Sequence, residues 1–431
     1  MTRTPRPRHQ YLFAIAAALP LLLAACSNSQ YPNTTFTHLT DMNRDSTSLW
    51  NLMIWLGIGV FVLVEVLLIY VMIRYRRRPN DAEPEHVHGN TALELTWTIL
   101  PAFVLAIIAV PTVQQIWKYQ SGAPANALQI DVIGRQWWWE FRYPEQNIVT
   151  ANELYIPTGR PVNFTLRSND VIHSFWIPNL GGKRDLMRNR TNFLWFTPDS
   201  VGTQAFNGSC NEYCGTSHAN MRFRAYTVSP DEFDRWVAGQ QANAVFPAAT
   251  ATPATTTPPA GGAAAATPVS AQTPPAVAAP VSAPGYVFPS EQLPAHVVPD
   301  TPIPAGLTID DAVLAAGDPQ RGFEQYSRSA CIGCHRIRGN PASPGVIGPD
   351  LTHFGSRHTL AAGLYPNDAR HLALWIKNAR KMKPQFMGSA TMPTLGMGEF
   401  DPITKATVTA GLGGLTDQQI ADIVAYLLSL K

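Results

Sequence analysis

Two long apolar runs constrain the fold of this chain most strongly. They cover roughly residues 49–73 and 95–117, and each has about the 20 residues that a helix needs to cross a bilayer. Tryptophans lie near their ends, where interfacial aromatic side chains are expected: Trp50, Trp55, Trp97 and Trp117. The arginine-rich stretch 74–78 lies between the runs, and the positive-inside rule places it in the cytoplasm. We therefore predict a two-helix transmembrane hairpin over residues 26–118, with the rest of the chain outside.

The N-terminus has the features of an export signal. Arg3, Arg6 and Arg8 precede an apolar run over residues 11–25 that is too short to span a bilayer comfortably. The run ends in Leu-Ala-Ala followed by Cys26, which resembles a bacterial lipoprotein signal. We predict a signal peptide over residues 1–25 and a lipidated Cys26. An ordinary secretory signal is the alternative, and both place the mature N-terminus outside the cytoplasm.

The exported part changes in character twice. Short β-rich segments separated by turn residues fill residues 129–228, which predicts a β-sandwich with strands near 129–132, 137–143, 152–156, 161–168, 193–196 and 222–228. Residues 240–290 are rich in Ala, Pro, Thr and Ser and contain no charged residue, so we expect an extended linker over 239–308. Helical periodicity then predicts a small all-α domain over 309–431, with helices at 321–327, at 369–378 and after Thr416.

A cluster of soft metal ligands lies in the predicted sandwich, within a span of twelve residues, 210–221. Cys210, Cys214, His218 and Met221 offer two thiolates, an imidazole and a thioether, a set that favours copper over hard cations. A single-copper site needs only one cysteine, so two sulfurs could bridge two metals. His173 would supply a second imidazole. A structural zinc site and a one-copper site are the alternatives, although structural zinc prefers Cys and His without Met.

This pattern resembles the dinuclear copper (CuA) motif of cytochrome c oxidase subunit II. The sequence Cys-x-Glu-x-Cys-Gly-x-x-His-x-x-Met follows an upstream His-Ser-Phe. The resemblance implies a cupredoxin-like domain over residues 119–238. It assigns copper to His173, Cys210, Glu212, Cys214, His218 and Met221, with both cysteines bridging.

The resemblance also divides these ligands and adds a second metal. It implies that His173 and Met221 complete one copper, and that His218 and the Glu212 carbonyl complete the other. The Glu212 side chain matches a ligand of a Mg²⁺ shared with subunit I.

Two further residues take roles from the resemblance. Trp137 opens a run of three tryptophans that cannot all face the core, because side chains alternate along a strand. It matches an exposed tryptophan at which electrons enter from cytochrome c. Glu94 matches a glutamate at the cytoplasmic mouth of a proton path into subunit I. A carboxylate that complements the start of a helix is the alternative for Glu94.

The C-terminal domain carries a second motif. Cys331-Ile-Gly-Cys334-His335 is the signature of covalent c-type haem attachment, with the histidine as an iron ligand. A thioredoxin-like motif would need a βαβ context. Methionine is a common sixth ligand, and we choose Met392, which precedes Pro393 and the last helix as in class I c-type cytochromes. Met387 stays open. The five cysteines are thereby all assigned, so we predict no structural disulfide.

Together these features resemble the electron-entry subunit of a proton-pumping, caa3-type haem–copper oxidase. The resemblance implies partners in subunit I, subunit III, an upstream cytochrome c or quinol–cytochrome c reductase, and membrane lipid. It places the chain in a bacterial plasma membrane with both metal domains on the periplasmic side. A net charge of +2 gives no reason to expect nucleic acid. The alternatives are an electron-transfer subunit of a nitrogen-oxide reductase and a copper metallochaperone.

Overall fold

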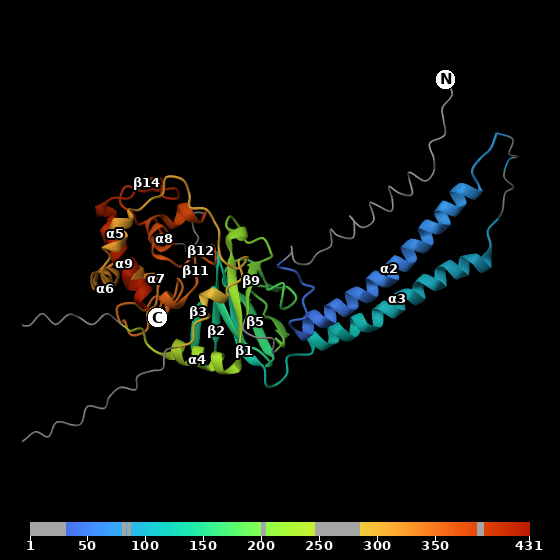
Figure 1. Cartoon of the computed structure of the whole chain (residues 1–431), viewed down its shortest axis with the longest axis horizontal. Coiled ribbons are helices and arrows are strands. Elements are labelled where there is room, and N and C mark those ends of the chain that lie inside the picture. Colours follow the sequence, from blue (N-terminus) through green and yellow to red (C-terminus); the bar gives the residue numbers. More distant parts are fainter. Residues whose placement is uncertain (1–31, 80–82, 84–87, 200–203, 246–284, 386–391) are drawn as a thin grey trace, which may run out of the picture.

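The computed structural model describes residues 32–79, 83, 88–199, 204–245, 285–385 and 392–431. Within these ranges it shows three parts in a row: a pair of long helices, a β-sandwich and a small C-terminal domain (Figure 1). The predicted signal peptide with Cys26 lies outside the described residues, as does Met387.

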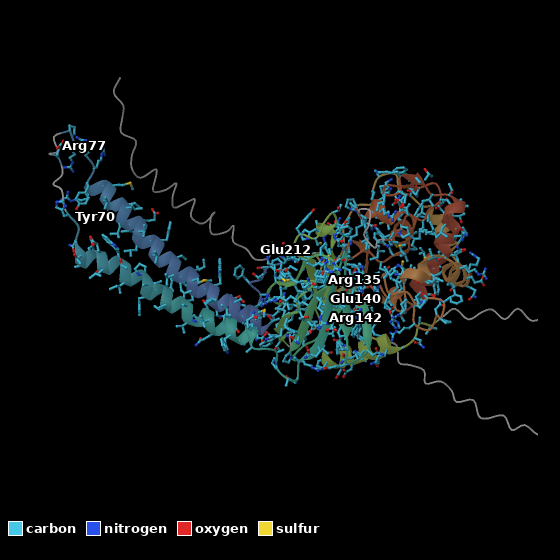
Figure 2. The ribbon with its side chains drawn as sticks, turned by 180° about the vertical axis from the view of Figure 1, so that it is seen from behind. Tyr70, Arg77, Arg135, Glu140, Arg142 and Glu212 are labelled. Carbon is cyan, nitrogen blue, oxygen red and sulfur yellow. The ribbon has the colours of Figure 1, made fainter. Side chains whose placement is uncertain are left out.

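The two apolar runs form an antiparallel helical hairpin. Its helices are α2 (Asp41–Arg74) and α3 (Thr91–Gln120), each longer than its apolar run. Both are long and apolar enough to cross a membrane, and their middle turns expose apolar side chains. Near the β-sandwich, Asp45 of α2 accepts hydrogen bonds from Lys118 (2.6 Å) and Tyr119 (2.7 Å) of α3. Arg77 lies at the opposite tip of the hairpin (Figure 2), so the arginine-rich loop and the folded domains are at opposite ends.

The predicted β-sandwich is confirmed, with two five-stranded sheets. One sheet has the order β3 (Ile148–Ala151), β2 (Trp138–Tyr143), β1 (Leu128–Arg135), β5 (Val162–Ser168) and β8 (Asn192–Phe196). The other has the order β4 (Glu153–Pro157), β10 (Arg222–Val228), β9 (Gln204–Cys210), β6 (His173–Trp176) and β7 (Arg184–Leu186). The helix α4 (Pro230–Gln241) follows β10 and begins with a capping box of Ser229 and Glu232.

Aromatic side chains from both sheets fill the space between them. The rings of Phe175 (β6) and Phe223 (β10) stack with centroids 5.0 Å apart, and Trp139 of β2 packs edge-on against Phe223 at 5.4 Å. Such pairs add to the stabilisation from apolar burial. On β2, the buried carboxylate of Glu140 forms ion pairs with Arg135 and Arg142 (Figure 2).

The C-terminal domain is helical, with two short β pairs that the all-α prediction missed. Its helices are α5 (Asp311–Ala315), α6 (Pro319–Arg328), α7 (Cys331–Cys334), α8 (Ala369–Met382) and α9 (Asp417–Ser429). The pairs are β11 (Thr359–Leu360) with β12 (Tyr365–Pro366), and β13 (Phe400–Asp401) with β14 (Ala406–Thr407). Helices α6 and α9 meet at Gly322, where a Cβ would lie 1.9 Å from the Asp422 carbonyl oxygen. Only glycine permits this approach.

The linker prediction over 239–308 needs correction at both ends. Helix α4 extends to Gln241. From residue 285 the chain packs against the β-sandwich, where Phe288 and Val297 are each 1% exposed within its core. Phe288 lies within the charge-free stretch and Val297 beyond it, and their burial fixes the chain that leads into the C-terminal domain.

Candidate metal and haem centres

The predicted copper ligands converge at one end of the sheet that contains β6, β9 and β10. Cys210 ends β9, and Met221 directly precedes β10. Between them the chain forms a loop and a short 3₁₀ helix, His218–Asn220. Antiparallel pairing of β6 with β9 sets Phe175 opposite Cys210, which brings His173 beside the loop. Gly134 of β1 packs on the His173 ring, where a Cβ would lie 2.6 Å away.

Donor atoms of five side chains and one backbone carbonyl lie around the sulfur atoms of Cys210 and Cys214. Around Cys210 Sγ lie Cys214 Sγ at 3.8 Å, His173 Nδ1 at 3.8 Å and the Glu212 carbonyl oxygen at 3.3 Å. Around Cys214 Sγ lie His218 Nδ1 at 3.6 Å and Met221 Sδ at 3.9 Å. All predicted copper ligands are thus brought together, with the Glu212 side chain pointing outward to the surface.

This donor set fits a dinuclear soft-metal centre. The Cys210–Cys214 sulfur separation of 3.8 Å is far beyond a disulfide bond of about 2.05 Å. It would let one ion lie about 2.3 Å from both sulfurs, an ordinary metal–thiolate distance. The loop is buried, with Cys214 2% and Met221 0% exposed. A buried thioether among thiolates and imidazoles is unsuited to structural zinc and suited to copper.

The contact between the two thiols makes their acidities unequal. It lowers the pKa of Cys210 to about 4 and raises the pKa of Cys214. A thiolate is therefore present at neutral pH, and it is the form that binds metal.

Asp170 orients the candidate ligand His173 and was missed by the sequence reasoning. Its Oδ1 lies 2.7 Å from His173 Nε2, which leaves Nδ1 directed at Cys210. Its Oδ2 accepts the backbone N–H of Gln136 at 2.7 Å. Burial opposes ionisation, but these hydrogen bonds outweigh it and hold the pKa of Asp170 below its ordinary value. A carboxylate three residues before a ligand histidine was the available signal.

The expected exposure of Trp137 is wrong. Trp137 is 3% exposed, because the C-terminal domain covers it. Its indole Nε1–H and the Gln136 side-chain amide both donate to the Cys214 carbonyl, at 3.0 and 2.7 Å. Trp138 is half-buried and Trp139 lies in the core. The tryptophan run thus reaches from the sandwich core to the loop of copper ligands.

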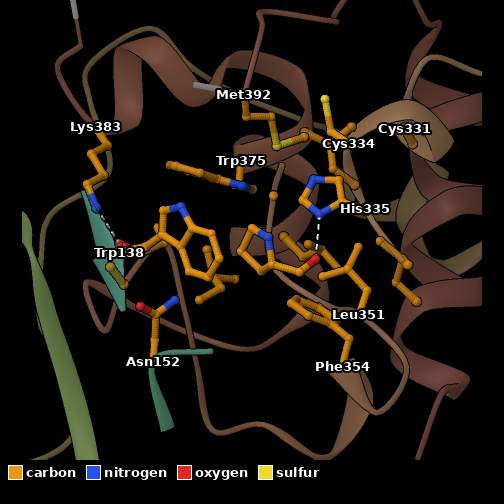
Figure 3. Close-up of a pocket in the computed structure, with 18 of the residues that line it drawn as sticks. Trp138, Asn152, Cys331, Cys334, His335, Leu351, Phe354, Trp375, Lys383 and Met392 are labelled. Carbon is orange, nitrogen blue, oxygen red and sulfur yellow. Dashed lines mark hydrogen bonds between the residues drawn. The ribbon is translucent and has the colours of Figure 1, made fainter. Parts of the chain in front are cut away.

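The haem motif opens into a cavity of about 460 Å³ between the two domains (Figure 3). This volume lies in the range of about 300–1,000 Å³ typical of ligand pockets. Cys331, Cys334, His335 and Met392 all line it, and Figure 3 shows His335 and Met392 directed into it. The β-sandwich contributes Gln136, Trp137, Trp138 and Asn152 to the opposite wall. The apolar lining and the two candidate axial ligands fit a covalently attached haem.

The imidazole of His335 has the orientation and the neutral form that iron binding requires. Its Nδ1 lies 2.8 Å from the Pro349 carbonyl oxygen, which leaves Nε2 free. Burial lowers the pKa of His335, so the ring is neutral, as metal ligation requires. Gly348 lies against the ring, where a Cβ would approach to 2.7 Å. The loop around Gly348 and Pro349 therefore fixes the ring orientation.

Within the part of the chain that the structure describes, Glu94 is the predicted functional residue that lies apart from both centres. It lies in the first turn of α3, after the cap residue Asn90, and is exposed.

Comparisons with known proteins agree with this arrangement. The model "Cytochrome C oxidase subunit II, transmembrane domain" matches residues 39–115, and that of the periplasmic domain matches 146–228. A cytochrome c model matches 319–431. "Cytochrome c oxidase subunit 2" of Synechocystis sp. is 32% identical over 246 residues, which cover 46% of this chain and 72% of that protein. This chain belongs to the cytochrome c oxidase subunit II family.

Members of the subunit II family also match over most of the chain. "Cytochrome c oxidase subunit 2" of Alkalihalophilus pseudofirmus is 29% identical over 86% of this chain and 83% of its own length. That of Bacillus subtilis is 27% identical over 91% and 95%. A solved structure, the periplasmic domain of subunit II (CoxB) of Bradyrhizobium japonicum, is 30% identical, covers 27% of this chain and 96% of its own, and has a TM-score of 0.26.

Proposed function

We propose that this chain is the electron-entry subunit of a proton-pumping terminal oxidase. It passes electrons from cytochrome c, through its own c haem and a CuA centre, to subunit I, where O₂ is reduced to water. The observation that carries the proposal is a shared wall. Trp137 lines the cavity that His335 and Met392 also line, and the Trp137 indole is hydrogen-bonded to the copper-ligand loop at Cys214.

The residues that would hold the two groups are those of the two centres. Cys210, Cys214, His173, Met221, His218 and the Glu212 carbonyl would hold the copper ions. Cys331 and Cys334 would attach the haem covalently, and His335 and Met392 would bind its iron. When bound, both groups would supply one-electron redox chemistry. The chain therefore relays electrons and leaves oxygen chemistry to its partner.

The protein's own residues hold this relay in place. Asp170 fixes the His173 ring and, through the Gln136 amide, the start of the Trp137 segment. Pro349 fixes His335. The tightly packed surroundings exclude water from Met221, Trp137 and His173, which are 0%, 3% and 0% exposed. Rigid, dry surroundings limit the reorganisation that accompanies each electron transfer.

The membrane arrangement and the partners complete the proposal. The hairpin anchors the chain in the bacterial plasma membrane, with the arginine-rich loop inside and both metal domains on the periplasmic side. A lipidated Cys26 would add a second anchor. The exposed Glu212 side chain would bind Mg²⁺ with subunit I, and Glu94 would stand at the entrance of a proton path. Subunit III completes the complex, and cytochrome c or a quinol–cytochrome c reductase supplies electrons.

Oxygen uptake by the purified complex tests this function. We expect uptake that depends on added reduced cytochrome c, together with two copper ions and one covalent haem per copy of this chain. A Cys210→Ser/Cys214→Ser variant should keep the haem and lose both copper and uptake. Consumption of nitrous or nitric oxide in place of O₂ would support a nitrogen-oxide reductase instead. Copper that transfers readily to a second protein would indicate a metallochaperone.

A further inference from the structure

The C-terminal domain lies on the β-sandwich through buried charged side chains. Glu153 of β4 and Arg224 of β10 are register partners on neighbouring parallel strands, and each is 3% exposed. Glu153 Oε1 accepts the backbone N–H groups of His358 (2.7 Å) and Thr359 (2.9 Å) in the C-terminal domain. A carboxylate of the sandwich is thus satisfied by the backbone of the other domain.

Arg224 makes a matching set of contacts from the next strand. Its Nη2 donates to the Gly363 carbonyl at 3.1 Å, within the C-terminal domain. Its Nε donates to the Val297 carbonyl at 2.7 Å, in the segment that leads into that domain. The backbone N–H of Arg222 adds a bond to Ala362 at 3.2 Å.

Lys383 reaches across in the opposite direction. It follows α8 and is 4% exposed. Its Nζ donates to the Trp137 carbonyl at 2.5 Å and to the Ala361 carbonyl at 3.3 Å. Figure 3 shows Lys383 beside Trp138 at the cavity. The neighbouring Pro384 accepts a hydrogen bond from Ser217, which lies next to the copper ligand His218. The C-terminal domain therefore contacts the copper-ligand loop directly.

The chain that enters the C-terminal domain is also fixed to the sandwich. Phe288 packs on Tyr226 with ring centroids 4.9 Å apart, and its N–H donates to the Tyr155 hydroxyl at 3.3 Å. Val297 is buried next to Arg224. The anchored segment and the docked domain thus form one continuous contact surface.

Buried charges of this kind indicate a lasting contact. Interfaces that form and separate rapidly keep their charges at a wet rim, where they steer encounter and contribute little to affinity. Here three ionisable side chains, those of Glu153, Arg224 and Lys383, have lost water, and each forms hydrogen bonds across the interface. Separating the domains would require water to replace each of these bonds at once, and losing a single partner leaves a buried charge unsatisfied.

We propose that the C-terminal domain is a fixed partner of the Trp137 face, held by Glu153, Arg224 and Lys383. This inference rests on the proposed function for its consequence: soluble donors cannot reach Trp137, so they deliver electrons to the C-terminal domain. The occupant of this face is the chain's own C-terminal part, described over residues 285–385 and 392–431. The linker then serves to bring the C-terminal domain to its place on the sandwich. The buried contacts, rather than the linker, set the distance between haem and copper.

Cutting the linker in the intact oxidase tests the fixed contact. A protease site is inserted at residue 261 of the full chain, and the purified complex is cleaved and passed over a size-exclusion column at low micromolar concentration. We expect the haem-bearing fragment to remain with the membrane-bound part. Separation of the two fragments from the otherwise unchanged protein would overturn the proposal.

Substitutions of the anchors test their assignment in the cleaved complex. Glu153→Gln and Lys383→Met should each weaken retention roughly 30-fold or more, as expected when one partner of a buried charged contact is removed. Lys381→Met is the matched control, because Lys381 is exposed two residues earlier on the same helix end; it should retain the fragment as the unsubstituted protein does. Unchanged retention in both anchor variants would refute the assignment. Copper and haem contents, measured in parallel, report on the proposed function independently of retention.

Discussion

The indole N–H of Trp137 donates to the carbonyl oxygen of Cys214 at 3.0 Å. Trp137 also lines the cavity that His335 and Met392 enter, so one residue both contacts the copper-ligand loop and borders the haem cavity. The contact is protected from water, since Trp137 is almost fully buried. A short, dry connection between the haem cavity and the copper-ligand loop follows from this relationship.

His218→Ala should abolish the mixed-valence signature of the copper centre. His218 Nδ1 lies 3.6 Å from Cys214 Sγ, and removing this imidazole leaves one copper with an incomplete set of ligands. Electron paramagnetic resonance of the purified protein measures the signature. His296→Ala, which removes an exposed imidazole, should leave it intact. A normal signature in the His218 variant would refute the copper assignment.

Asp170→Ala should weaken copper binding about 10- to 100-fold, the usual effect of removing the partner that orients a ligand histidine. The His173 ring would lose its 2.7 Å contact and could rotate. Competition with a copper chelator gives the affinity, and Asp300→Ala is a control at an exposed carboxylate. Equal affinity in the Asp170 variant and the unsubstituted protein would show that packing alone holds His173.

Met392→Ala should change the haem spectrum and lower its reduction potential, because thioether ligation raises the potential. Redox titration followed by visible absorption measures both. Met397→Ala is the matched control, since Met397 is 43% exposed. If the Met392 variant keeps its spectrum while Met387→Ala alters it, the sixth ligand is Met387.

Asp422→Asn should destabilise the C-terminal domain by about 1.5–3 kcal/mol, the usual value of hydrogen bonds to a charged group. Burial alone would raise the pKa of Asp422, but hydrogen bonds from Arg321 and two further donors outweigh it and hold the pKa below its ordinary value. A lowered carboxyl pKa stabilises the fold above the unfolded-state value and loses this effect as pH falls through the folded-state value.

The free-energy advantage of the unsubstituted protein over the variant should therefore be complete at neutral pH. It should begin to fall as pH approaches the unfolded-state value of about 4, and be lost at lower pH as the folded-state carboxyl protonates. Denaturant unfolding at a series of pH values measures it. Glu324→Gln, an exposed carboxylate on α6, should show no such pH dependence. A difference between Asp422→Asn and the unsubstituted protein that stays constant down to pH 2 would contradict the account.

The local parts of both centres could be predicted from the sequence. Cys210, Cys214, His218 and Met221 lie in one loop, so spacing alone reveals their chemistry. Thr416 is the cap of the last helix as predicted, because a capping box is a local motif. The short strands β6 and β7, of four and three residues, carry too little pattern to be recognised.

The burial of Trp137 could not be predicted, because it depends on a contact with Lys383, 246 residues away in sequence. The role of Glu153 could not be predicted either. Its partners are the backbone N–H groups of His358 and Thr359, which are distant in sequence and carry no sequence signal. The composition of residues 240–290 indicated a linker, but the burial of single apolar residues such as Phe288 determines where it ends.

The central claim is that electrons enter this chain at its haem and leave it through copper. Its most direct test is rapid mixing of the oxidised complex with a reduced soluble cytochrome c, with haem and copper absorption followed together. We predict that haem is reduced first and that its reoxidation has the same rate as copper reduction, with Trp137→Phe slowing that second phase. Copper reduction that precedes haem reduction, or that proceeds at the same rate without haem, would contradict it.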